Sequence, residues 1–201
     1  QAELQLIKKQ LTAARTRLLF SAPWEPGKDG KSAYQPAIND MQSHGLDVMG
    51  TTQPRAAAFL SGLKSNVLYG MRHKGQAWRD LRDLDFEGRL AAIRDSNMRT
   101  RLIEEAKVME GAQSIGQTMT SSRFSIPPAA SFWMGDEERP NYTGGSEMSL
   151  ETLSAQANEH PAETWIRLMV ESNGQGLFMV RFVNQDLEVL PDFMRSDWIV
   201  P

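Results

Sequence analysis

Residues 17–51 place one helical segment between two short β-prone runs, and this order constrains the fold more than any other feature. Residues 17–22 form an apolar run that predicts a short buried strand, which ends before Pro23. Residues 34–44 predict a helix with Gly45 well placed to end it, and residues 46–51 predict the next strand. A strand, a helix and a strand in this order favour parallel pairing through a helical crossover.

A long helical region follows these elements. Residues 56–112 are expected to be mostly helical, which is long for one crossover and indicates a helical insertion on the scaffold. Asp85 and Ser96 each precede apolar residues at helical spacing, so each is expected to cap a helix.

The last third of the chain returns to alternating elements. A strand is expected over 132–134, helices from Ser149 and from Pro161, and further strands over 177–182 and 198–200. We therefore predict an α/β fold, best explained as part of a (β/α)8 TIM-like barrel or of an open sheet. Most of its strands are expected to be parallel neighbours.

The composition excludes several classes of protein. The 201 residues include no cysteine, which excludes a disulfide scaffold, a thiolate zinc site and a cysteine nucleophile. The 22 Lys and Arg residues nearly balance the 25 Asp and Glu residues, which argues against a dedicated nucleic-acid binder. No apolar run approaches the roughly 18–20 residues of a membrane span, and no signal-peptide pattern is present. We expect a soluble, cytoplasmic protein without nucleic-acid or membrane partners.

Both ends of the sequence interrupt a pattern. Leu4, Ile7 and Leu11 recur at helical spacing with no capping residue before them. The apolar run over 198–201 has no element after it. We expect a truncated segment with unpaired strand edges, which leaves a homo-oligomer or a larger assembly open.

The three histidines lack the spacing of a metal site. His44 is expected at the C-terminal end of a helix, His73 in a polar surface stretch and His160 beside a helix start. No two of them are separated as in His-x-His or His-x-x-x-His. We therefore expect no metal ligand and no tightly bound zinc in this chain alone.

Polar side chains follow two of the predicted strands. Ser21 ends the first strand, and Thr52, Gln53 and Arg55 follow the second. In parallel α/β proteins the chemistry lies at the carboxyl ends of strands, and hydroxyl, amide and guanidinium donors can hold a carboxylate or a carbonyl oxygen. These four are the candidate substrate-binding residues, and no catalytic residue is assigned. The alternative, equally open, is an ordinary polar loop with Arg55 in solvent.

Four segments of the chain resemble one known family. The stretch from His44 to Arg55, HGLDVMGTTQPR, resembles a barrel strand of the N-acyl-D-amino-acid deacylase (D-aminoacylase-like) branch of the amidohydrolase superfamily. The segments 95–101, 149–174 and 184–201 are similar to successive stretches of the same branch. The resemblance covers most of the chain, roughly residues 12–201, and it is carried by the order and spacing of the four segments.

The resemblance implies a metal-dependent hydrolase with a (β/α)8 barrel. Residues 1–201 would form the C-terminal part of that barrel domain, with the helical insertion at about 56–112. In this family a metal ion, usually zinc, activates the water that cleaves the amide bond of an N-acyl amino acid. An Asp after the final strand acts as the acid–base residue. The acyl group and the stereochemistry of the substrate stay open, with the D-isomer as one possibility.

The sequence also departs from the family pattern. It lacks the His-x-His of the first barrel strand, it has Ala22 where relatives place a His after Ser21, and the expected Gly-Ser-Asp would follow Pro201. The resemblance assigns only Gln53 and Arg55, as substrate-side positions. We therefore expect amidase activity only when flanking sequence is present, with zinc as the cofactor of the full-length parent.

Two other functions remain open from the sequence. One is a non-catalytic amidohydrolase-like subunit that uses the barrel segment as a structural or interaction platform. The other is an unrelated α/β binding domain that is complete in 201 residues.

Overall fold

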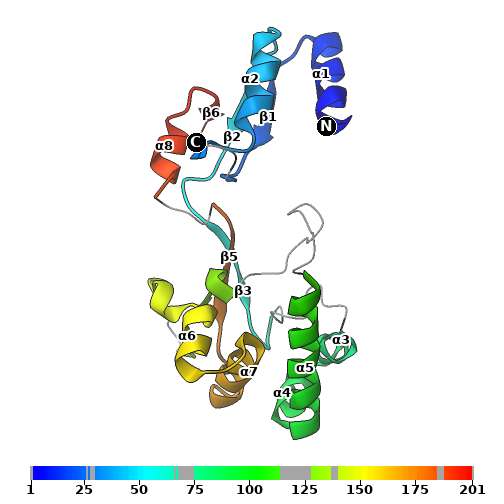
Figure 1. Ribbon diagram of the computed structural model, residues 1–201, viewed down its shortest axis with the longest axis vertical. Helices are drawn as coiled ribbons and strands as arrows, with labels where there is room; N and C mark the ends of the chain where they lie inside the picture. Colours follow the sequence, from blue (N-terminus) through cyan, green and yellow to red (C-terminus); the bar gives the residue numbers. More distant parts are fainter. Residues whose placement is uncertain are drawn as a thin grey trace. The chain divides into compact units, whose positions relative to one another are not determined.

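The chain folds into two units of mixed α/β structure with two small sheets, as a computed structural model shows (Figure 1). The first unit comprises Gln1–Ala57 and Arg181–Pro201, and the second comprises Ala58–Val180. The structure describes residues 2–25, 27, 30–65, 67, 75–113, 128–136, 140–184 and 188–200.

The first unit is built on a three-stranded parallel sheet. Its elements are α1 (Ala2–Ala14), β1 (Leu18–Ser21), α2 (Gln35–Ser43), β2 (Val48–Thr51), α8 (Leu190–Met194) and β6 (Ile199–Val200). The strand order is β1-β2-β6, and in this register Ser21 lies opposite Thr51, which lies opposite Val200. The three strands predicted here and their parallel pairing are therefore confirmed, with α2 as the crossover between β1 and β2.

One face of this parallel sheet packs against helices. Phe20, Val48 and Ile199 point to that face because side chains alternate along each strand. The helices contribute the buried side chains Ile38 and Met41 from α2 and Leu190 and Phe193 from α8. The apolar layer between sheet and helices forms the core of the first unit.

Gly50 lies in the middle of β2, on the face that the helices cover. A Cβ atom there would come within 2.8 Å of the Ala22 side chain, 2.9 Å of Ile199 and 3.1 Å of Trp198. Contacts this short force neighbouring atoms to move. Close packing therefore explains a glycine inside a strand, where the residue is otherwise unfavourable.

The opposite face of the parallel sheet is partly exposed. The Leu19 side chain of β1 is 61% exposed, and Val200 of β6 is 41% exposed on the same face. Met49, between them on β2, is half-buried. This face therefore presents accessible apolar surface, which is unusual because parallel sheets are ordinarily covered on both faces.

The second unit contains most of the helices. Its elements are β3 (Ala57–Ser61), α3 (Gln76–Asp83), α4 (Phe86–Arg94), α5 (Ser96–Gln113), the 3-10 turn η2 (Pro128–Ala130), β4 (Ser131–Trp133), the 3-10 turn η3 (Ser146–Met148), α6 (Leu150–Ala157), α7 (Pro161–Glu171) and β5 (Phe178–Val183). The sheet has the order β3-β5-β4, and β4 and β5 are antiparallel.

One sequence prediction for this region is wrong, and another is confirmed. The helical region does not begin at residue 56, because Ala57–Ser61 is strand β3. Alanine has the highest helix propensity of all residues, but propensity is a small term, and pairing with β5 prevails over it. The strand predicted over 177–182 is confirmed as β5, which pairs antiparallel with β4, whereas the strands β1, β2 and β6 are parallel as expected for most of the strands. After strand β3, helices α3, α4 and α5 confirm the mostly helical character that was expected for residues 56–112.

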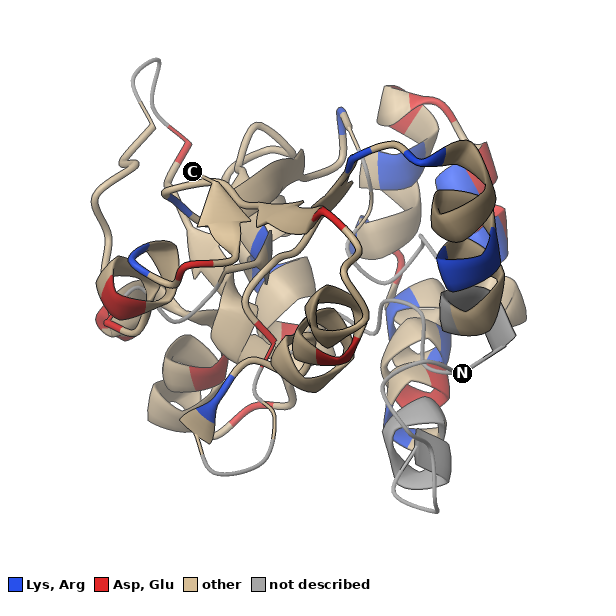
Figure 2. Cartoon of the chain, turned by 90° about the horizontal axis from the view of Figure 1, so that it is seen from above, with Lys and Arg blue, Asp and Glu red and all other residues tan. Residues whose placement is uncertain are grey.

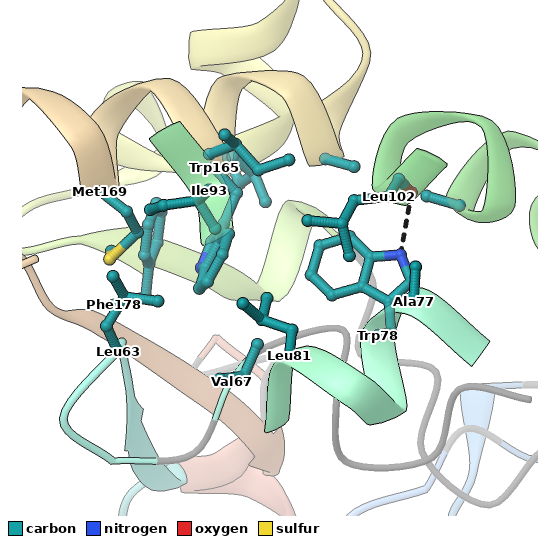
Figure 3. Packing of buried hydrophobic residues seen from close by; sticks show 14 of the residues in the cluster. Leu63, Val67, Ala77, Trp78, Leu81, Ile93, Leu102, Trp165, Met169 and Phe178 are labelled. Atoms are coloured by element: carbon teal, nitrogen blue, oxygen red, sulfur yellow. Dashed lines mark hydrogen bonds between the residues drawn. The ribbon is translucent and has the colours of Figure 1, made fainter. Parts of the chain in front are cut away.

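The core of the second unit is centred on two tryptophans. Trp78 from α3 and Trp165 from α7 are fully buried, with ring centroids 6.0 Å apart in an edge-to-face arrangement. The Trp78 indole Nε1 donates a hydrogen bond of 2.9 Å to the Leu102 carbonyl oxygen of α5 (Figure 3). Burial and a satisfied indole together fix α3, α5 and α7 against one another.

Helix ends follow the sequence signals, with one exception. The Asp85 carboxylate accepts a 2.8 Å hydrogen bond from the Gly88 N–H and caps α4 as expected. The cap of α5 is Asp95, which accepts from the Met98 N–H at 2.8 Å, and the prediction of Ser96 is wrong by one residue. A carboxylate suits this position because it faces the positive end of the helix dipole. Gly45 follows α2 with a φ of +73°, as its predicted place beyond the helix end requires.

The described elements establish a mixed α/β class, and the closed barrel stays a prediction. None of the helices in the described part of the chain is long and apolar enough to cross a membrane.

An ion pair joins the α6–α7 connection to α7. The Arg167 Nε lies 3.0 Å from Oε1 of Glu159, and the Thr164 hydroxyl donates a 2.7 Å hydrogen bond to Oε2 of the same carboxylate. The hydrogen bond from Arg167, and more weakly that from Thr164, lowers the pKa of Glu159 below its usual range, while partial burial opposes them.

Replacing Gly50 with Ala should lower the free energy of unfolding by about 1–3 kcal/mol, because the added methyl group overpacks the layer under α2 and α8. Urea denaturation measures the change. Leu19→Ala, on the exposed face of the neighbouring strand, is the control and should change stability by less than about 1 kcal/mol. Equal losses for the two variants would contradict the assignment of faces.

The Glu159 ion pair should make stability depend on pH. A carboxyl whose pKa is lowered by folding stabilises the protein above its unfolded pKa, and the contribution is lost as pH falls through the folded pKa. Glu159→Gln should therefore differ more from the wild type at pH 7 than in acid, in thermal unfolding across that range. Arg167→Ala should flatten the same pH dependence. A difference in stability between the wild type and Glu159→Gln that does not change with pH would contradict the proposed role of the ion pair.

Candidate functional site

The candidate residues meet at one edge of the parallel sheet. Ser21 ends β1, and Thr52, Gln53 and Arg55 follow the end of β2, whose last residue pairs with Ser21. The Ala22 N–H donates to the Thr51 carbonyl at 2.8 Å, so the pairing continues to the edge. The four residues, here called the polar edge, therefore lie at the carboxyl ends of neighbouring parallel strands, as the sequence predicted.

A single side chain connects the loops of the polar edge. The Asn184 Nδ2 donates to the Gln53 carbonyl oxygen at 2.8 Å and to the Thr52 Oγ1 at 3.2 Å. The Asn184 Oδ1 accepts a 2.6 Å hydrogen bond from the backbone N–H of Trp24, in the loop after β1. The amide therefore links the loop after β1, the loop after β2 and the segment that follows β5.

Sequence reasoning missed Asn184. It is only 1% exposed, and its backbone lies in the left-handed region with a φ of 52°. Asparagine is among the few residues other than glycine that adopt this conformation readily. A lone Asn directly after the apolar run of β5 is the only signal that the sequence offers, and it points to a turn rather than to these partners.

The side chains of the polar edge differ in exposure. Ser21, Gln53 and Arg55 are exposed, and Thr52 is half-buried. Among the residues that the structure describes, no carboxylate pairs with the Arg55 guanidinium. Arg55 therefore presents a cation, beside hydroxyl and amide groups, to whatever approaches the edge.

A hydrogen bond between a tyrosine and a glutamate lies within the loop after β1. The Tyr34 hydroxyl donates a 3.0 Å hydrogen bond to the Glu25 carboxylate. Burial raises the pKa of Tyr34 to about 12, with a further contribution from the hydrogen bond and charge of Glu25. The phenol stays neutral near neutral pH, so its function in this loop is to donate a hydrogen bond.

Two of the three histidines lie at helix ends. His44 follows α2, where its Nδ1 lies 2.6 Å from the Asp40 carbonyl oxygen. His160 precedes α7, where its Nδ1 accepts from the Ala162 N–H at 3.2 Å. Both positions agree with the sequence prediction, and His73 lies outside the described residues.

The described residues do not fit a zinc site. Among them, no three His, Asp or Glu side chains gather closely enough to hold a metal ion. The polar edge instead offers neutral donors and one guanidinium, a set that suits a carboxylate or a carbonyl oxygen. Elsewhere, basic and acidic residues are interspersed along the helices (Figure 2).

Comparison with known proteins gives no assignment. No family model, curated protein or solved structure matches this chain.

Proposed function

We propose that this chain forms the substrate-side wall of a metal-dependent amidohydrolase that hydrolyses the amide bond of N-acyl amino acids. The observation that carries the proposal is the polar edge, where an exposed Arg55 without a described carboxylate partner lies at the carboxyl end of a helix-backed parallel sheet. This is the edge at which parallel α/β enzymes bind substrates. The reaction class comes from the family resemblance of the sequence.

The two faces of the parallel sheet support the barrel part of the proposal. In a (β/α)8 barrel, each strand has helices on its outer face and apolar side chains filling the interior on the other. Phe20 and Val48 pack toward the helices, and Leu19 and Val200 point to the partly exposed apolar face. Further strands of the same barrel would cover that face.

The polar edge suits the two polar ends of an N-acyl amino acid. The Arg55 guanidinium pairs with the substrate carboxylate, for which its planar donors are well matched. The Gln53 amide and the Ser21 and Thr52 hydroxyls can donate to the acyl oxygen. These contacts bind and orient the substrate, and they leave its configuration open.

In such an enzyme a metal ion supplies an activated water. The described residues do not fit that ion, so its ligands would be other residues. The described part of this chain contributes binding and orientation only.

A non-catalytic subunit is the second candidate. The exposed apolar side chains Leu19 and Val200 favour it, because an open sheet face also suits contact with another protein. Zinc-dependent hydrolysis of N-acetyl amino acids by the protein that contains this chain would exclude this candidate. A protein that binds these ligands without turnover would support it.

Replacing Arg55 with Ala should weaken the binding of N-acetyl-D-alanine or of its L-isomer by about 10- to 150-fold. A charge-assisted hydrogen bond contributes about 1.5–3 kcal/mol, which corresponds to that range. Calorimetric or NMR titration measures the affinity, and the melting temperature should stay near that of the wild type because the side chain is exposed.

Arg17→Ala is the matched control. Arg17 is an exposed arginine just before β1, at the opposite end of the sheet, where its Nε lies 2.6 Å from Asp47. Its loss should leave the affinity unchanged. A second control is N-acetyl-alanine amide, which lacks the carboxylate and should be insensitive to Arg55→Ala. Binding unaffected by Arg55→Ala, or weakened equally by both variants, would refute the proposed site.

A further inference from the structure

We infer that Asn184 is the positioning residue of this site, and that its side-chain amide holds Arg55 where it can meet a substrate carboxylate. The identity of the ligand in this inference rests on the proposed function. The hydrogen bonds of Asn184 are independent of that function. Asn184 does not itself touch the substrate, and it acts through the loop that carries Arg55.

The chemistry of an amide is what the position needs. The Oδ1 accepts from the Trp24 N–H while the Nδ2 donates to Thr52 and Gln53. A carboxylate of the same shape would keep the first bond and lose the others, since it has no hydrogen to donate. The site is therefore specific for a side chain that accepts and donates at once.

The hydrogen bonds join segments that the chain order keeps apart. Asn184 is 160 residues from Trp24 and 132 residues from Thr52. Its burial gives these bonds a low-dielectric environment, where leaving a donor or acceptor unpaired is costly. One side chain thus sets the relative position of the loops after β1 and β2.

Arg55 depends on this arrangement through its backbone. The Asn184 Nδ2 lies 2.8 Å from the Gln53 carbonyl and 3.5 Å from the Arg55 carbonyl, on either side of Pro54. The ring of Pro54 restricts its own φ and the conformation of Gln53. The hydrogen bond to the Gln53 carbonyl therefore anchors the loop directly before this stiff residue, and the contact with the Arg55 carbonyl is longer and weaker. This anchor therefore fixes the backbone from which the exposed Arg55 side chain extends.

Two substitutions separate the two halves of the amide. Asn184→Asp keeps the acceptor for Trp24 and removes the donor to the loop after β2, whereas Asn184→Gly removes both and still tolerates a positive φ. Asn158→Asp is the control, because Asn158 also has a left-handed backbone, with a φ of 53°, but ends helix α6 in the other unit. All variants are made in the 201-residue chain, and the melting temperature of each is measured.

The ligand-free arm uses NMR relaxation of backbone amides. In Asn184→Asp we expect lower order parameters at Gln53 and Arg55, with those of Trp24 and of α2 unchanged. In Asn184→Gly we expect Trp24 to loosen as well. Order parameters at Gln53 and Arg55 that match those of Asn158→Asp would overturn the inference, whether or not any ligand binds.

The ligand arm is a double-mutant cycle with N-acetyl-D-alanine. Asn184→Asp alone should weaken binding about tenfold, and it should add less than about twofold in the Arg55→Ala background, since coupled residues are not additive. Full additivity would overturn the positioning role. If the wild type does not bind the ligand, the proposed function fails, and the relaxation data alone decide whether Asn184 fixes the loop.

Discussion

The parallel pairing of β1 with β2 is the interaction on which the rest of the first unit depends. It runs to the carboxyl end of both strands, where the Ala22 N–H donates to the Thr51 carbonyl, and β6 extends it through the bond from Gly50 to Trp198. Parallel strands require a crossover, and here α2 supplies it on one face of the sheet. Because side chains alternate, the same pairing leaves the opposite face with apolar side chains that are only partly covered.

The polar edge follows from this pairing. Parallel strands in register bring their carboxyl ends to one side, so Ser21 and the residues after Thr51 become neighbours although 30 residues separate Ser21 from Thr51. The buried amide of Asn184 adds hydrogen bonds to both of the loops that follow these strands. The parallel sheet and the hydrogen bonds of Asn184 thus position the loop that carries Arg55, an exposed cation, at an edge suited to ligand binding.

Much of the local structure could be predicted from the sequence because the signals are local. The strand before Pro23, the helix that ends just before Gly45 and the cap at Asp85 each depend on a few adjacent residues. Strand β3 could not be predicted, since its alanines favour a helix and only pairing with β5 decides otherwise. The contacts of Asn184 could not be predicted from the sequence either, because they also depend on long-range partners. Its partners lie more than 100 residues away, and no periodicity in the sequence encodes them.

The most direct measurement is a titration of the isotope-labelled chain with N-acetyl-D-alanine, followed residue by residue by NMR. The account predicts saturable shifts at Ser21, Ala22, Thr52, Gln53 and Arg55, with the amides of α3 to α7 unaffected. The uncharged analogue N-acetyl-D-alanine amide should produce smaller shifts at the same residues, because the carboxylate is the group that Arg55 recognises. Saturable shifts confined to the second unit, or none at any residue, would contradict a ligand site at the carboxyl edge of the parallel sheet.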